Sequence, residues 1–139
     1  MASDLAAAKA KYAGRPRESL KILYDHELKN APGKSIVGME LSYEPNGWSP
    51  PHRHAGATAV AYVLEGKFLS GMNGNPAQVY KAGEKFVELP GCHHTVSDNN
   101  SSTESMKAIV VVVVDTAVLK TEKGYAALVE IDEEWAEHA

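Results

Sequence analysis

The amino-acid sequence predicts an all-β protein, either a sandwich or a jelly-roll barrel. Segments with the composition of strands recur at intervals of roughly 8 to 12 residues along most of the chain, with turn sequences rich in Gly, Pro and Asn between them. The chain has 139 residues, a length that suits a single domain with one hydrophobic core. We therefore expect one barrel with one site.

The N-terminal segment, residues 1–16, is predicted to be an arm or a short helix that precedes the barrel. Residues Asp4–Tyr12 are rich in Ala and Lys, which favour a helix, and Gly14 and Pro16 end the segment. Residues 17–139 are assigned to the barrel domain with a short C-terminal tail.

Nine segments of the barrel domain are predicted to be strands, because each is rich in β-branched, aromatic or other apolar residues and ends at a turn sequence. In chain order they are Leu20–Leu28, Ser35–Tyr43, Thr58–Leu64, Lys67–Met72, Gln78–Tyr80, Lys85–Leu89, Thr95–Ser97, Met106–Val114 and Tyr125–Ile131. The acidic tail Asp132–Ala139 is expected to form a short surface helix, with Trp135 packing back on the barrel.

The segment Met106–Val114 also predicts an association between copies of the chain. Its residues Ala108–Val114 form the longest apolar run of the sequence and would be apolar on both faces of a strand. Because one face fills the barrel and the other needs cover, we expect a homodimer.

Composition and charge argue against several classes of partner. The formal net charge is −4, and no cluster of Lys or Arg offers a surface for nucleic acid. The longest apolar run is far shorter than the roughly 20 residues that span a bilayer, so we expect no membrane association. An acid at Asp4 and no apolar stretch after it indicate no secretion signal, and a single cysteine, Cys92, fits a reducing compartment. The expected location is the cytoplasm.

Four of the six histidines fall in two tight groups, and these groups predict a metal site. The first group contains His52 and His54, whose side chains would share one face of a strand, while Arg53 points the other way. The second group, His93-His94, supplies a third imidazole from another strand. Imidazole nitrogen binds Zn, Cu, Fe and Ni, so His52, His54 and His94 are predicted to hold one divalent ion. The alternative is a set of surface or packed histidines without a metal.

The residues around the first histidine group resemble the first motif of the cupin superfamily, G-x5-H-x-H-x3,4-E-x6-G. The match runs from Gly47 through His52 and His54 to Gly66, with the leading spacing one residue short. The motif's glutamate is missing, because its two positions hold Thr58 and Ala59.

The second histidine group resembles the second motif of the same superfamily, G-x5-P-x-G-x2-H-x3-N. Gly83, Gly91 and His94 fall at the family spacings, and the proline is displaced by one residue to Pro90. The resemblance extends over residues 47–99 and implies a double-stranded β-helix that holds a metal and a small ligand between its two sheets. Without the glutamate, it implies either a three-histidine site, as in some cupin dioxygenases, or a barrel that binds no metal.

Glu88 is the candidate catalytic residue. It alternates with Phe86 in the strand Lys85–Leu89, so both side chains would lie on one face. If that face is the interior, Glu88 can serve as a general base beside the metal or approach the metal itself. The alternative is an exposed acid on the outside of the strand.

The favoured function is a metal-dependent enzyme that acts on a small molecule, with a three-histidine dioxygenase-type oxidoreductase as the first hypothesis. A non-redox isomerase or lyase is the second hypothesis, and a non-catalytic cupin that binds a small ligand is the third, since one fold hosts many activities. The sequence leaves the metal open among Fe, Zn, Ni, Mn and Cu.

Overall fold

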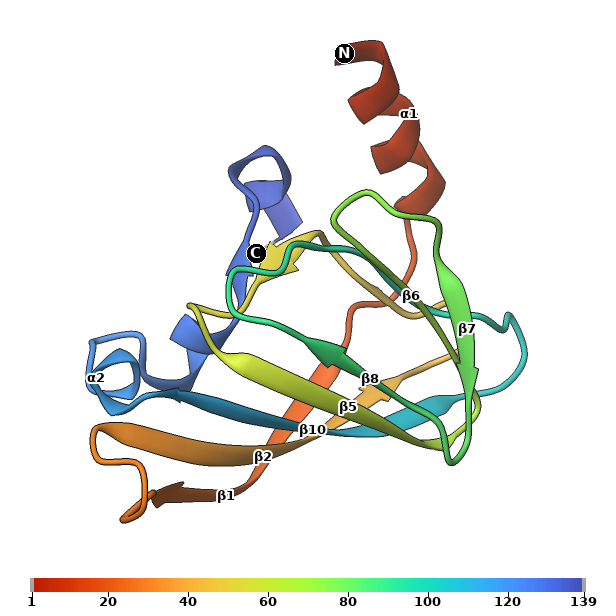
Figure 1. Cartoon of the computed structure of the whole chain (residues 1–139). Helices are drawn as coiled ribbons and strands as arrows, with labels where there is room; N and C mark the ends of the chain where they lie inside the picture. The colour runs from red at the N-terminus through yellow and green to blue at the C-terminus, as the bar shows by residue number, and fades with distance from the viewer. Residues whose placement is uncertain (1, 139) are drawn as a thin grey trace.

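Two antiparallel sheets face each other in the computed structural model, which describes residues 2–138 (Figure 1). The first sheet has the strand order β1-β2-β10-β5-β8, and the second has the order β11-β4-β9-β6-β7, with β3 paired to β9. The strands are β1 (Ser19–Glu27), β2 (Lys34–Tyr43), β3 (Trp48–Ser49), β4 (His52–Arg53), β5 (Thr58–Glu65), β6 (Lys67–Met72), β7 (Gln78–Lys81), β8 (Lys85–Glu88), β9 (His94–Asn99), β10 (Met106–Asp115) and β11 (Glu130–Ile131). This is the jelly-roll arrangement that the sequence predicts.

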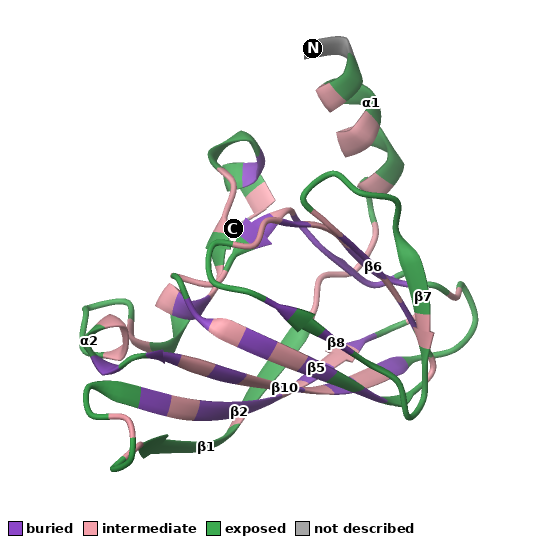
Figure 2. Ribbon diagram, viewed as in Figure 1, coloured by how far each residue is buried: buried purple, intermediate pink, exposed green. Residues whose placement is uncertain are grey.

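The core lies between the sheets, and β10 shows how the sequence builds it. Along this strand buried side chains alternate with half-buried ones, as the two-residue period of a strand requires (Figure 2). Ala108, Val110, Val112 and Val114 are buried, whereas Ile109, Val111 and Val113 lie on the outer face of the sheet. The described residues include no helix that is both long enough and apolar enough to span a membrane.

The two ends of the described chain meet at one edge of the barrel. Helix α1 (Ala2–Tyr12) ends at Tyr12, whose ring stacks on that of Trp48 with 4.3 Å between centroids. The C-terminal 3-10 helix η2 (Glu133–His138) places Trp135 edge-on to Trp48 at 5.6 Å. Trp135 is buried, so the predicted packing of the tail on the barrel is confirmed.

The expected strand Tyr125–Ile131 is wrong over most of its length. A short helix α2 (Thr116–Leu119) follows β10, and the 3-10 helix η1 (Gly124–Leu128) replaces the strand, leaving only β11 as extended chain. Gly124 has a positive φ of 55°, which turns the chain, and the small Ala126 and Ala127 favour a helical turn. The turn buries Leu128 completely.

Candidate metal centre

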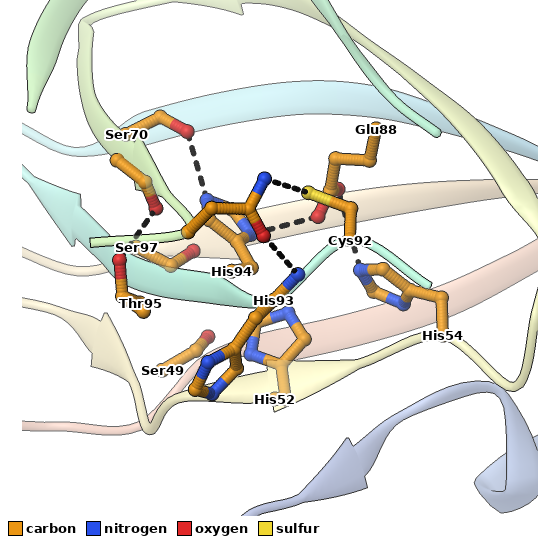
Figure 3. Close-up of polar contacts among 12 residues, drawn as sticks. Ser49, His52, His54, Ser70, Glu88, Cys92, His93, His94, Thr95 and Ser97 are labelled. Atoms are coloured by element: carbon orange, nitrogen blue, oxygen red, sulfur yellow. Dashed lines mark hydrogen bonds and ion pairs between the residues drawn. The ribbon is translucent and has the colours of Figure 1, made fainter. Parts of the chain in front are cut away.

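Four side chains converge in the interior of the barrel (Figure 3). His52 lies in β4, His54 directly follows that strand, Glu88 ends β8, and His94 begins β9. One possible ligand atom from each lies within 4.8 Å of those of the other three. His52, Glu88 and His94 are buried, and the side chain of His54 is 10% exposed. The three predicted metal ligands therefore meet at one point, and Glu88 joins them.

Irregular backbone on two neighbouring strands brings His52 and His94 opposite each other. They are cross-strand partners, with ring centroids 5.0 Å apart. Between β6 and β9 the register shifts: Gly71 pairs with Val96 but Met72 pairs with His94, so Thr95 is an extra residue. Such a bulge turns the side chains beside it, a device that is common next to functional sites.

Each histidine is oriented by a hydrogen bond from the ring nitrogen that faces away from the cluster. His52 Nδ1 donates to the carbonyl of Pro50 at 2.7 Å, and His54 Nδ1 donates to the carbonyl of Leu128 at 2.8 Å. Because a carbonyl can only accept, Nδ1 carries the proton of the neutral ring in both cases, and Nε2 of the neutral ring then offers its lone pair to a metal. His94 Nε2 lies 2.8 Å from Ser70 Oγ, which leaves Nδ1 facing the cluster.

The Glu88 carboxylate lies between two of these rings. Its Oε2 is 3.3 Å from His54 Nε2, and its Oε1 is 3.3 Å from His94 Nδ1 (Figure 3). Oε1 is buried and has no hydrogen-bond partner. Nitrogen lone pairs and a carboxylate that face one another repel unless a cation or a proton lies among them, so the donor set fits a divalent metal ion.

The pKa shifts of His52, His94 and Glu88 favour the protonation states that metal binding requires, and the shift of His54 opposes it. Burial, together with the nearby His94 and His54, lowers the pKa of His52 to about 3, and burial also lowers the pKa of His94. Burial raises the pKa of Glu88, but the hydrogen bond to His54 and the charge of the neighbouring histidines outweigh it and bring the pKa down to about 2. For His54, burial lowers the pKa, yet Glu88 raises it by more. A bound metal would displace the proton that this raised pKa favours on the His54 ring.

Glu88 lies next to the position of the glutamate that the first motif lacks. Glu88 is the cross-strand partner of Ala59 in β5, and Ala59 stands at one of the two motif positions for that glutamate. Partners in register share a sheet face with about 5 Å between their Cβ atoms, so an acid on either strand reaches the same space. Ala59 is fully buried and small enough to leave room.

Sequence reasoning proposed Glu88 as a general base and assigned only three histidines to the metal. The structure puts its carboxylate among the possible ligand atoms, which gives a cluster of three His and one Glu. Two features of the sequence point to Glu88 as a ligand. Glu88 alternates with Phe86 on one face of its strand, and the first motif lacks its own glutamate. Pairing β5 with β8 is the step that the sequence alone does not provide.

The cluster lines a small cavity with mainly apolar walls. The cavity offers about 50 Å³ to the centres of water molecules, which corresponds to about four waters. Its apolar lining comes mainly from the first sheet, which provides Leu20, Met39, Leu41, Ala61, Phe86 and Val110. The second sheet adds Phe68, and the segment between η1 and β11 adds Val129. Glu18, Leu20, Met39 and Val129 also line a larger groove outside, so the cavity opens there.

Comparison with known proteins identifies the family. The family model described as Cupin domain matches residues 39–112, more than half of the chain. The chain belongs to the cupin family.

Among curated cupin relatives, the chain is similar to germin-like protein subfamily 2 member 2 from Arabidopsis thaliana, with 35% identity over 86 residues. That match covers 57% of this chain and 39% of the relative. Oxalate oxidase 1 from Hordeum vulgare is 34% identical over 73 residues, covering 45% of this chain and 36% of the relative. The chain thus spans about two-fifths of the length of these relatives.

Solved structures share the fold at low identity. A structure of oxalate oxidase with the substrate analogue glycolate has a TM-score of 0.56 at 22% identity, covering 81% of this chain and 62% of that one. KdgF from a Halomonas species has a TM-score of 0.55 at 17% identity, covering 69% of this chain and 77% of the other. These similarities show that the fold is shared.

Proposed function

We propose that this protein is a metal-dependent oxidoreductase that holds one divalent ion on His52, His54, Glu88 and His94 and acts on a small organic acid. The observation that carries the proposal is the buried Glu88 carboxylate, which lies 3.3 Å from the nitrogens of two histidines and has no other partner on Oε1. A mixed nitrogen and oxygen donor set suits iron, manganese and nickel.

The bound metal would supply a Lewis acid with open positions and, if it is redox-active, a centre for oxygen chemistry. The chain provides the rest of the site. Three neutral imidazoles and one carboxylate leave a divalent site with a net charge of about +1, which favours an anionic ligand. The apolar walls lower the local dielectric constant and so strengthen that attraction.

A redox reaction is favoured over an isomerase or a lyase because the cavity offers few groups for proton transfer. Glu88, the expected general base, lies among the possible metal ligands. Glu18 is the other carboxylate of the cavity lining, and it accepts hydrogen bonds from Arg17 at 2.9 Å on both oxygens. Tied to Arg17, it is poorly placed to move a proton on a ligand in the cavity. The similarity to an oxalate oxidase supports the same choice.

Oxygen uptake tests this proposal. Protein loaded separately with Mn²⁺ and with Fe²⁺ would be given a panel of small organic acids in an oxygen electrode. We expect metal-dependent oxygen uptake with at least one acid, lost in His54→Ala and retained in His26→Ala, whose histidine lies exposed in β1. Metal binding without oxygen uptake by any acid would refute the oxidoreductase and leave a ligand-binding cupin.

We also propose that the chain forms a homodimer through the outer face of the first sheet. Cross-strand pairs join Ile109 to Tyr62, Val111 to Val60, and Val60 to Val87, so one apolar stripe crosses β10, β5 and β8. Tyr62 is 45% exposed and Val87 is 42% exposed, a contiguous surface that association would cover. Light scattering should give twice the 15.0 kDa chain mass for the wild type and the monomer mass for Val111→Lys. A monomeric wild type would refute the dimer.

A further inference from the structure

Three hydroxyl groups form a second polar cluster in the same cavity. Tyr43 Oη lies 2.6 Å from Ser49 Oγ and 2.8 Å from Ser97 Oγ, and all three residues line the cavity with the histidines. Tyr43, Ser49 and Ser97 are 1%, 7% and 3% exposed. We call these three residues the hydroxyl cluster.

One O–H group of the hydroxyl cluster has no acceptor within the cluster. Three hydroxyls carry three protons, and the two hydrogen bonds that join them consume two. Whichever way the bonds run, one O–H has no acceptor within the cluster. A buried donor without an acceptor is costly, so this proton is suited to an oxygen atom of a ligand in the cavity.

The backbone holds the hydroxyl cluster at a fixed distance from the metal centre. Ser49 pairs with Ser97 across β3 and β9, and three residues further along, His52 pairs with His94. The pair Pro50-Pro51 separates β3 from β4, and the bulge at Thr95 lies opposite, so both pairs face the cavity. The ring of Phe68 lies between the two poles, 5.8 Å from Tyr43 and 6.2 Å from His94.

We propose that the hydroxyl cluster is a binding subsite for the far end of the ligand, and that the ligand is a singly charged acid with a neutral carbonyl or hydroxyl oxygen at its other end. The inference rests on the proposed function, because the carboxylate of this acid binds at the metal centre. The hydroxyl cluster donates one hydrogen bond to the second oxygen, and the apolar walls pack on the carbon chain between the two ends.

The charges around the cavity favour a ligand whose far end is neutral. None of the residues that line the cavity is Lys or Arg, and Glu18 stands at the mouth. A second carboxylate would therefore be buried beside neutral hydroxyls without a counter-charge, at a large desolvation cost. A carbonyl or alcohol oxygen needs only the hydrogen bond that the cluster can donate.

The separation of the two poles sets the length of the ligand. Three residues of strand span at most about 10 Å. A metal–oxygen bond takes up about 2 Å and a hydrogen bond about 3 Å of this span, which leaves at most roughly 5 Å between the two oxygen-bearing ends. That upper limit corresponds to an acid of about five carbons, and the volume of such an acid is close to that of the four waters that the cavity can hold.

The test compares two acids of equal length, pentanoate and 4-oxopentanoate, which differ only in the distal carbonyl. Protein loaded with Co²⁺ would be titrated with each acid, and the visible absorption of the cobalt would report binding. In the wild type we expect 4-oxopentanoate to bind about three- to tenfold more tightly than pentanoate, which is the contribution of one net hydrogen bond. Pentanedioate, with a charged far end, should bind no more tightly than pentanoate.

The triple variant Tyr43→Phe/Ser49→Ala/Ser97→Ala removes all three hydroxyls and leaves no member of the hydroxyl cluster unpaired. We expect it to fold, because apolar replacement of all partners costs little. It should take up one equivalent of cobalt and bind pentanoate as the wild type does, while the affinity ratio of the two acids falls to about one. The matched control is Ser35→Ala/Thr116→Val, which removes another buried hydroxyl pair, 2.7 Å apart and outside the cavity lining, and should keep the ratio.

The subsite is refuted if wild-type protein binds 4-oxopentanoate and pentanoate with equal affinity. It is also refuted if the triple variant loses thermal stability but keeps the wild-type ratio of the two affinities, because the hydroxyls would then only join the sheets. If the triple variant does not fold, the wild-type ratio and the response to pentanedioate still decide. A wild type that takes up no cobalt fails the proposed function and the subsite together, whereas cobalt uptake with a ratio of one fails the subsite alone.

Discussion

The two cupin motifs of this chain contribute differently to the metal centre. The first motif provides His52 and His54 but no carboxylate, whereas the second provides both His94 and Glu88. The strands β5 and β8 that carry Ala59 and Glu88 are neighbours in register, so the carboxylate reaches the same point from either strand. Which residues can bind the metal therefore depends on where their side chains lie in the fold, and not on the order of residues within one motif.

The two motifs also orient their histidines by different means. Backbone carbonyls of Pro50 and Leu128 hold His52 and His54, whereas the side chain of Ser70 holds His94. A carbonyl remains after almost any substitution, but a hydroxyl can be removed. Only the second motif therefore has a histidine whose orientation depends on one replaceable side chain.

Loss of a histidine should reduce metal affinity the most, and by the same factor for a histidine of either motif. His54→Ala and His94→Ala are each expected to weaken metal binding roughly 100- to 1,000-fold, the share of one ligand in a four-ligand site. Competition with a chromophoric chelator measures the affinity. If either variant bound metal like the wild type, that histidine would not be a ligand, and the equivalence of the motifs would fail.

Loss of the Glu88 carboxylate should have the second-largest effect on metal affinity. Glu88→Gln keeps the size of the side chain and one oxygen but removes the negative charge, so we expect metal affinity to fall roughly 100-fold. The control is Glu65→Gln, which removes an exposed carboxylate from the end of β5. Wild-type affinity in Glu88→Gln would show that the metal is held by histidines alone and would restore Glu88 as a candidate base.

Loss of the orienting hydroxyl should have the smallest effect. Ser70→Ala removes the partner 2.8 Å from His94 Nε2, and we expect metal affinity to fall about tenfold, as is usual for groups that hold a metal ligand in place. The same chelator competition measures it, with Ser105→Ala at an exposed position as the control. An unchanged affinity would mean that packing against Phe68 and Phe86 is enough to orient His94.

The sequence predicted what depends on local pattern. The alternation along Met106–Val114 and the turn residues located the strands, and the spacing of the histidines located three members of the metal centre. The strand expected over Tyr125–Ile131 was wrong because Gly124 turns the chain into a 3-10 helix that buries Leu128 and leaves Tyr125 exposed.

What the sequence did not predict depends on contacts between distant segments. The place of Glu88 follows from the pairing of β8 with β5, and the hydroxyl cluster joins Tyr43 to Ser97 across 54 residues of chain. Single serines and a tyrosine carry no motif, so only their convergence in the cavity distinguishes them from ordinary strand residues. The bulge at Thr95, which sets the facing of His94, likewise becomes visible only in the register of β6 and β9.

The relocated carboxylate can be tested directly by moving it back. Metal content and affinity would be measured for the wild type, for Glu88→Ala and for the double variant Ala59→Glu/Glu88→Ala, which returns the acid to β5. Our account predicts about one equivalent of metal in the wild type, a loss of roughly 100-fold in affinity in Glu88→Ala, and recovery to within about tenfold of the wild type in the double variant. A double variant that binds no better than Glu88→Ala, or a Glu88→Ala protein that binds like the wild type, would contradict the account.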